Sequence, residues 1–131
     1  MSELRQGPVR VLLVEDNDVY RDSLVFLLGR YDGIEVVGAV ADGRSAPRAC
    51  DELAAAVVVL DYRLPDVDGA EAADDVRARC PQASIVFLSA SSGAKEAAAA
   101  RSHGAAFVRK DDGVDTLVEA VRAAAAARSA A

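Results

Sequence analysis

One stretch of the sequence decides the fold: Val57-Val58-Val59-Leu60-Asp61-Tyr62-Arg63-Leu64-Pro65-Asp66-Val67-Asp68-Gly69. An apolar run stops at a single carboxylate, and a proline and a glycine follow. A continuous run of this kind is typical of a strand buried on both faces, which places Asp61 where the strand leaves the core. An aspartate at such a point often only caps the next turn. Its neighbours in space therefore decide whether it carries chemistry.

Polar residues also follow other apolar runs of the chain. Glu15 and Asp16 come after the run at 9–14, Ser89 after 84–88, and Lys110 after 105–108. The sequence predicts five strands, at 9–14, 34–40, 56–60, 84–88 and 105–108. Helical patterns lie between and after them, at 18–30, 43–53, 69–79, 93–103 and 114–128, with Asp112 as the expected N-cap of the last.

This alternation predicts an α/β fold of the doubly wound (βα)5 type, with helices on both faces of a five-stranded parallel sheet. The common strand order for such a sheet is 2-1-3-4-5. Sites in open parallel sheets form beyond the carboxyl ends of the strands, where the strand order reverses. We therefore expect Glu15, Asp16 and Asp61 to share one crevice, although they lie far apart in the sequence.

The composition indicates a single compact domain. The chain has 131 residues, 52% of them hydrophobic, and a formal net charge of -6. We expect this domain at 9–127, with a tail at 1–8 and a tail or the start of a linker at 128–131. The negative charge argues against direct binding of nucleic acid by this segment. No apolar run is long enough to span a membrane and no signal peptide is present, which predicts a cytoplasmic protein.

The two cysteines, Cys50 and Cys80, have no metal-ligand spacing, and we expect them to be reduced and buried.

Three carboxylates in one crevice repel one another unless protons or a cation compensate. Ligands that are all oxygen favour Mg²⁺, Mn²⁺ or Ca²⁺ over zinc, and of these Mg²⁺, for which Mn²⁺ can substitute, typically bridges to phosphate oxygens. Lys110 and Ser89, at the same edge, offer an ammonium and a hydroxyl to a phosphoryl group. An aspartate can itself accept a phosphoryl group. The residues thus indicate phosphoryl chemistry at Asp61.

The ordered set of motifs resembles the receiver domain of two-component response regulators. The matching segments, which together cover about residues 8–127, are Val14-Glu15-Asp16-Asn17, Asp61-x-x-Leu64-Pro65-x-x-Asp68-Gly69, Ser89-Ala90 and Phe107-Val108-Arg109-Lys110. The resemblance implies a flavodoxin-like receiver fold and a signalling domain that catalyses only its own phosphorylation and dephosphorylation. It also implies a sensor histidine kinase as partner, and a homodimer or an output domain that controls transcription.

The resemblance assigns roles to individual residues. Asp61 would be the phosphoacceptor. Asp16, Asp61 and the backbone carbonyl of Arg63 would bind Mg²⁺, and Glu15 would assist through water. Lys110 would pair with the phosphoryl group.

Two further residues would form the switch of the family. Ser89 would hydrogen-bond the phosphoryl group and shift on activation, and Phe107 would turn inward as Ser89 moves.

Some positions depart from the commonest pattern of the family. Glu15 replaces an aspartate, and Asp111-Asp112 follow Lys110 where proline is frequent, as in regulators of the LuxR/NarL type. Arg63 and Ser91 hold rim positions that tune the lifetime of the phosphoryl group. His103, the single histidine, is expected to be a surface or structural residue.

Three other functions compete with this interpretation. A degenerate receiver would act only by binding, although the complete set of site residues disfavours it. A Mg²⁺-dependent phosphatase similar to the haloacid dehalogenases would need an aspartate two residues after the nucleophile, where this chain has Arg63. A flavodoxin would need a phosphate-binding loop where this chain has Glu15-Asp16-Asn17-Asp18.

Overall fold

The structure is a computed structural model that describes residues 7–90, 94–102 and 104–130. Strands and helices alternate along the chain. Their bounds are β1 (Val9–Val14), α1 (Asp18–Leu28), β2 (Ile34–Val40), α2 (Ala46–Leu53), β3 (Val57–Asp61), α3 (Gly69–Arg79), β4 (Ser84–Ser89), α4 (Ala94–Ser102), β5 (Ala106–Arg109), the 3-10 helix η2 (Lys110–Asp112) and α5 (Val114–Ala130).

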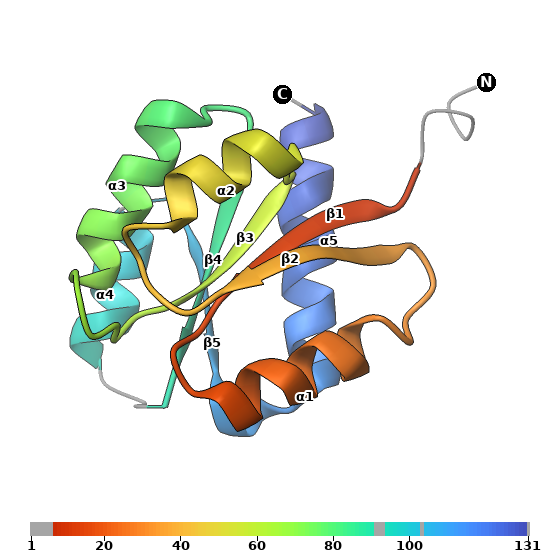
Figure 1. Cartoon of the computed structure of the whole chain (residues 1–131), viewed down its shortest axis with the longest axis horizontal. Helices are drawn as coiled ribbons and strands as arrows, with labels where there is room; N and C mark the ends of the chain where they lie inside the picture. Colours follow the sequence, from red (N-terminus) through yellow and green to blue (C-terminus); the bar gives the residue numbers. More distant parts are fainter. Residues whose placement is uncertain (1–6, 91–93, 103, 131) are drawn as a thin grey trace.

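The strands form one parallel sheet in the order β2-β1-β3-β4-β5, which confirms the predicted topology (Figure 1). The direction in which successive strands are added to the sheet reverses between β1 and β3. The carboxyl ends of these two parallel strands therefore flank the predicted crevice. In the register of the sheet Val14 pairs with Leu60, Asp61 with Leu88, and Ser89 with Arg109.

The helices cover the two faces of the sheet separately. Figure 1 shows α1 and α5 on one face and α2, α3 and α4 on the other. Leu24 and Leu28 of α1 pack with Leu117 and Val121 of α5 on the first face. The second face is packed by smaller side chains from α2, α3 and α4 around the fully buried Phe87. The middle strand β3 is buried throughout, as its continuous apolar run predicts.

One helix start and one helix cap differ from the predictions. Helix α2 begins at Ala46 rather than at residue 43, because the Asp66 carboxylate binds the backbone N–H groups of Gly43 and Arg44 and holds that segment as a loop. Asp112 does not cap α5. Its carboxylate accepts the backbone N–H of Arg109 and closes the η2 turn instead.

The surface carries one further notable feature, on α1. Val19, Val25, Phe26 and Leu27 are the large apolar side chains exposed in the described part of the chain, and Phe26 lies under the Arg30 guanidinium. None of the helices in that part is long and apolar enough to span a membrane. Both expected cysteines are fully buried and carry free thiols.

Candidate functional site

Asp61 lies at the carboxyl end of β3, with only 4% of its surface exposed. Its Oδ1 accepts the backbone N–H of Arg63 at 3.0 Å. The loop that follows returns to the strand, where the Gly69 N–H donates to the Tyr62 carbonyl at 3.1 Å. Asp68 then caps α3 by accepting the N–H of Ala70. The motif between Asp61 and Gly69 therefore fixes the Asp61 carboxylate against its own loop.

Lys110 brings a positive charge to this carboxylate. Its Nζ lies 3.1 Å from Asp61 Oδ2 and 2.9 Å from Glu15 Oε1. The residue follows β5 as the first residue of η2, one position beyond the end of the strand. Burial alone would lower the pKa of Lys110, but the two carboxylates outweigh it and raise the pKa above its usual value. The ammonium therefore stays charged.

Glu15 and Asp16 complete an acidic cluster with Asp61. One carboxylate oxygen from each residue lies within 4.8 Å of the other two. Glu15 is buried and Asp16 is exposed, so that the cluster opens to solvent on the side of Asp16. Burial raises the pKa of Glu15, although Lys110 and the Asn17 N–H favour its ionised form. Three oxygen donors with no histidine or thiol fit a hard divalent cation such as Mg²⁺.

The remaining predicted residues lie around this cluster. Ser89 is buried at the end of β4, with 1% of its surface exposed. Phe107 is half-buried in β5 and packs against the core that faces α2, α3 and α4. Ser91 and His103 lie outside the described residues.

Two residues near the site were not predicted. The Tyr20 ring centroid lies 4.7 Å from Lys110 Nζ, and burial raises the pKa of its hydroxyl. Glu96 of α4 binds the Arg63 guanidinium at 2.8 Å. Tyr20 lies in the first turn of α1, four residues after Asp16, and Glu96 interrupts an alanine-rich helix with a carboxylate. Both features can be seen in the sequence, but neither indicates a contact with the site until the fold is known.

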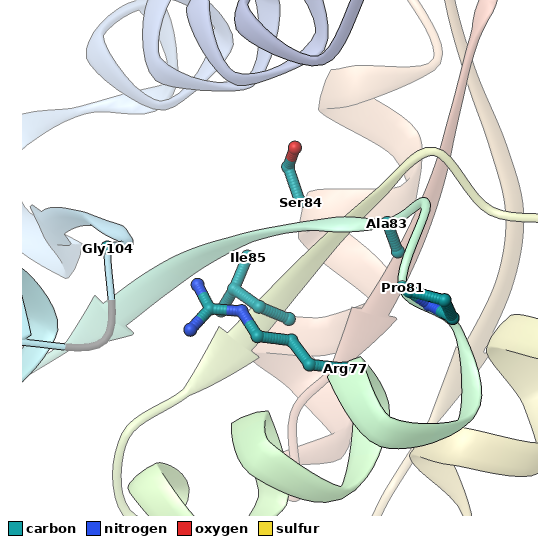
Figure 2. Close-up of a pocket in the computed structure, with 6 residues that line it drawn as sticks. All are labelled: Arg77, Pro81, Ala83, Ser84, Ile85 and Gly104. Carbon is teal, nitrogen blue, oxygen red and sulfur yellow. The ribbon is translucent and has the colours of Figure 1, made fainter. Parts of the chain in front are cut away.

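A hollow at the opposite end of the sheet lies away from these groups. Its volume is about 400 Å³, and Figure 2 shows Arg77 reaching across Ile85 while Ser84 points to the other side of β4. The Ser84 hydroxyl donates to the Ala124 carbonyl of α5. The hollow sits at the amino end of β4, whereas the acidic cluster lies at the carboxyl ends of the strands. We therefore place the candidate site at the acidic cluster.

Comparison with known proteins identifies the family to which this fold belongs. The family model of the response regulator receiver domain matches residues 11–122. The response regulator protein VraR of Staphylococcus epidermidis is 30% identical over 115 residues, which are 87% of this chain and 55% of that protein. The chain spans between 27% and 55% of the length of curated relatives such as these.

Solved structures show the same likeness. A LuxR-family response regulator from Aurantimonas sp. SI85-9A1 is 32% identical with a TM-score of 0.86, over 93% of this chain and 88% of that one. The receiver domain of the putative response regulator NarL from Mycobacterium tuberculosis is 31% identical with a TM-score of 0.84, over 91% and 97%. The fold and site thus define an α/β signalling domain. The chain belongs to the response regulator receiver domain family of two-component systems.

Proposed function

We propose that the domain is a phosphorylation switch in which Asp61 accepts a phosphoryl group from a sensor histidine kinase. The observation that carries the proposal is the position of the Asp61 carboxylate. It lies between the Lys110 ammonium and a pair of further carboxylates that can hold a divalent cation. Phosphoryl transfer needs an in-line nucleophile and positive charge around the transferred oxygens, and these residues supply both.

The chain's own groups account for the transfer. An Asp61 carboxylate oxygen attacks phosphorus while the P–N bond of a phosphohistidine breaks. The nitrogen that held phosphorus takes the bonding pair, and the imidazole leaves as a neutral ring that keeps the proton already on its other nitrogen. Lys110 moves from Asp61 to an oxygen of the phosphoryl group. Asp16, Asp61 and the Arg63 carbonyl would hold Mg²⁺, with Glu15 acting through water, and such an ion would supply positive charge to the phosphoryl oxygens. Hydrolysis later breaks the P–O bond to Asp61 and releases inorganic phosphate.

The output of the switch follows from Ser89 and Phe107. Ser89 would donate its hydroxyl to the phosphoryl group, and Phe107 would move into the space beside it, which changes the surface of α4, β5 and α5. A two-state surface of this kind controls a homodimer or an attached output domain. The proteins that the chain resembles include transcriptional regulatory proteins, which supports transcription as the process that is controlled.

Incubation with Mg²⁺ and acetyl phosphate, followed by intact-mass measurement, tests the proposal. We expect one phosphoryl adduct on the wild-type chain, no adduct on Asp61→Asn, and an unchanged adduct on Asp22→Asn, an exposed α1 variant that serves as the control. A folded chain that gains no adduct with acetyl phosphate or with a phosphorylated kinase would overturn the proposal. It would indicate a degenerate receiver that acts by binding alone.

A further inference from the structure

An ion pair connects the loop that follows Asp61 to α4. Arg63 Nη2 donates to Glu96 Oε2 at 2.8 Å, and the backbone N–H of the same arginine donates to Asp61 Oδ1 at 3.0 Å. Arg63 therefore contacts the acceptor carboxylate with its backbone and α4 with its side chain. A single residue thus spans the distance between the candidate site and a neighbouring helix.

The two partners of this ion pair are buried to very different extents. The Glu96 side chain is 8% exposed, whereas the Arg63 side chain is 72% exposed. The pKa of Glu96 lies below its usual value, because its own backbone N–H and the Arg63 guanidinium stabilise the ionised form. Removing one partner from a buried charge is costly, while an exposed guanidinium moves readily to another anion. Breaking the ion pair therefore costs the buried Glu96 carboxylate more free energy than it costs the exposed Arg63 guanidinium.

Helix α4 buries little apolar surface against the sheet. Its inward residues are alanines, of which Ala100 is fully buried and Ala97 and Ala99 are half-buried. Each alanine buries a single methyl group, so hydrophobic burial anchors α4 weakly compared with the leucine-rich α1. The ion pair to Arg63 is therefore a substantial part of the attachment of α4.

We propose that Glu96 is a positioning residue that holds the Arg63 guanidinium, and that a phosphoryl group on Asp61 draws Arg63 away and loosens α4. This inference rests on the proposed function. A phosphoryl group places two negative charges beside Arg63, and a guanidinium binds phosphate oxygens in bidentate fashion. Once Arg63 leaves, the Glu96 carboxylate is buried without its partner, and α4 must move to hydrate it.

Hydrogen exchange of α4 tests the release of the helix. In the wild type we expect amide exchange over 94–102 to accelerate about 10-fold after treatment with acetyl phosphate and Mg²⁺. In Glu96→Gln exchange is fast before treatment and changes less than 2-fold afterwards, whereas Glu71→Gln, an exposed α3 variant, behaves like the wild type. Unchanged α4 exchange in a wild-type chain that carries the adduct would overturn the inference.

A double-mutant comparison separates positioning from a merely structural role. Arg63 that is free of Glu96 shields the phosphoryl group from water, so we expect Glu96→Gln to lengthen the lifetime of the adduct about 3-fold. Arg63→Gln shortens it, and the double variant matches Arg63→Gln because Glu96 acts only through Arg63. An equal effect of Glu96→Gln in both backgrounds would refute the positioning role. Intact mass reports the adduct separately, so its absence would count against the proposed function rather than against this inference.

Discussion

Gly69 offers a direct test of how tightly the acceptor loop, residues 62–68 between Asp61 and α3, is packed. A Cβ atom at this position would lie 2.4 Å from the Tyr62 carbonyl oxygen, 2.7 Å from its Cα and 2.9 Å from its carbonyl carbon. All three contacts are with backbone, so no side-chain rotation relieves them. Gly69→Ala must therefore push the loop away from Tyr62 and break the hydrogen bond between Gly69 N–H and the Tyr62 carbonyl.

The expected cost combines the overlap and the lost hydrogen bond. Overpacking costs about 1–3 kcal/mol and a backbone hydrogen bond about 1 kcal/mol, so we expect the free energy of unfolding to fall by about 2–4 kcal/mol. Urea unfolding measures this value, and labelling with acetyl phosphate should slow, because Tyr62 adjoins Asp61. Gly7→Ala is the control, since a Cβ there meets no atom within 4 Å. A Gly69→Ala protein within 0.5 kcal/mol of the wild type would refute the steric reasoning.

Three further predictions concern the charged site and the buried thiols. Lys110→Met leaves the Asp61 and Glu15 carboxylates without their ammonium partner. Urea unfolding should show that the free energy of unfolding falls by about 2–3 kcal/mol, and saturating Mg²⁺ should restore part of it. Equal stability of the variant and the wild type would contradict this. Tyr20→Leu removes the ring face beside Lys110 and should slow labelling by acetyl phosphate about 3-fold, whereas Tyr20→Phe keeps the wild-type rate; equal rates in both variants would exclude the cation–π contact. Burial raises the pKa of Cys50 to about 12, so the folded chain loses stability as the pH rises from about 9 towards 12. At pH 8 the Cys50 thiol should resist iodoacetamide until urea unfolds the chain. Rapid alkylation of the folded protein would show that solvent reaches the thiol.

The sequence sufficed to predict the sheet because its signals are local and repeated. Four of the five apolar runs end at a polar residue. Parallel strands bring those ends to one edge, so the contact of Asp61 with Lys110 follows from topology. The residues at the strand ends were therefore predicted together, although their roles in phosphoryl transfer remain predictions.

The contacts made by helices and loops could not be predicted in the same way. The pairing of Arg63 with Glu96 depends on how α4 is rotated about its axis, and an alanine-rich sequence gives no apolar stripe from which to read that rotation. The late start of α2 depends on Asp66, a residue of a different loop. A contact between two separate loops cannot be predicted from a pattern of neighbouring residues.

The two hydrogen bonds of Asp66 also bear on how this domain can be recombined with its relatives. Because one carboxylate of the acceptor loop holds the amides of Gly43 and Arg44, the β2–α2 loop and the β3–α3 loop form one structural unit. A chimera that replaced α2 and its preceding loop alone would separate Asp66 from its partners. The block that can be exchanged intact therefore runs from the end of β2 to the start of α3, and crossover points within it should yield poorly folded chains.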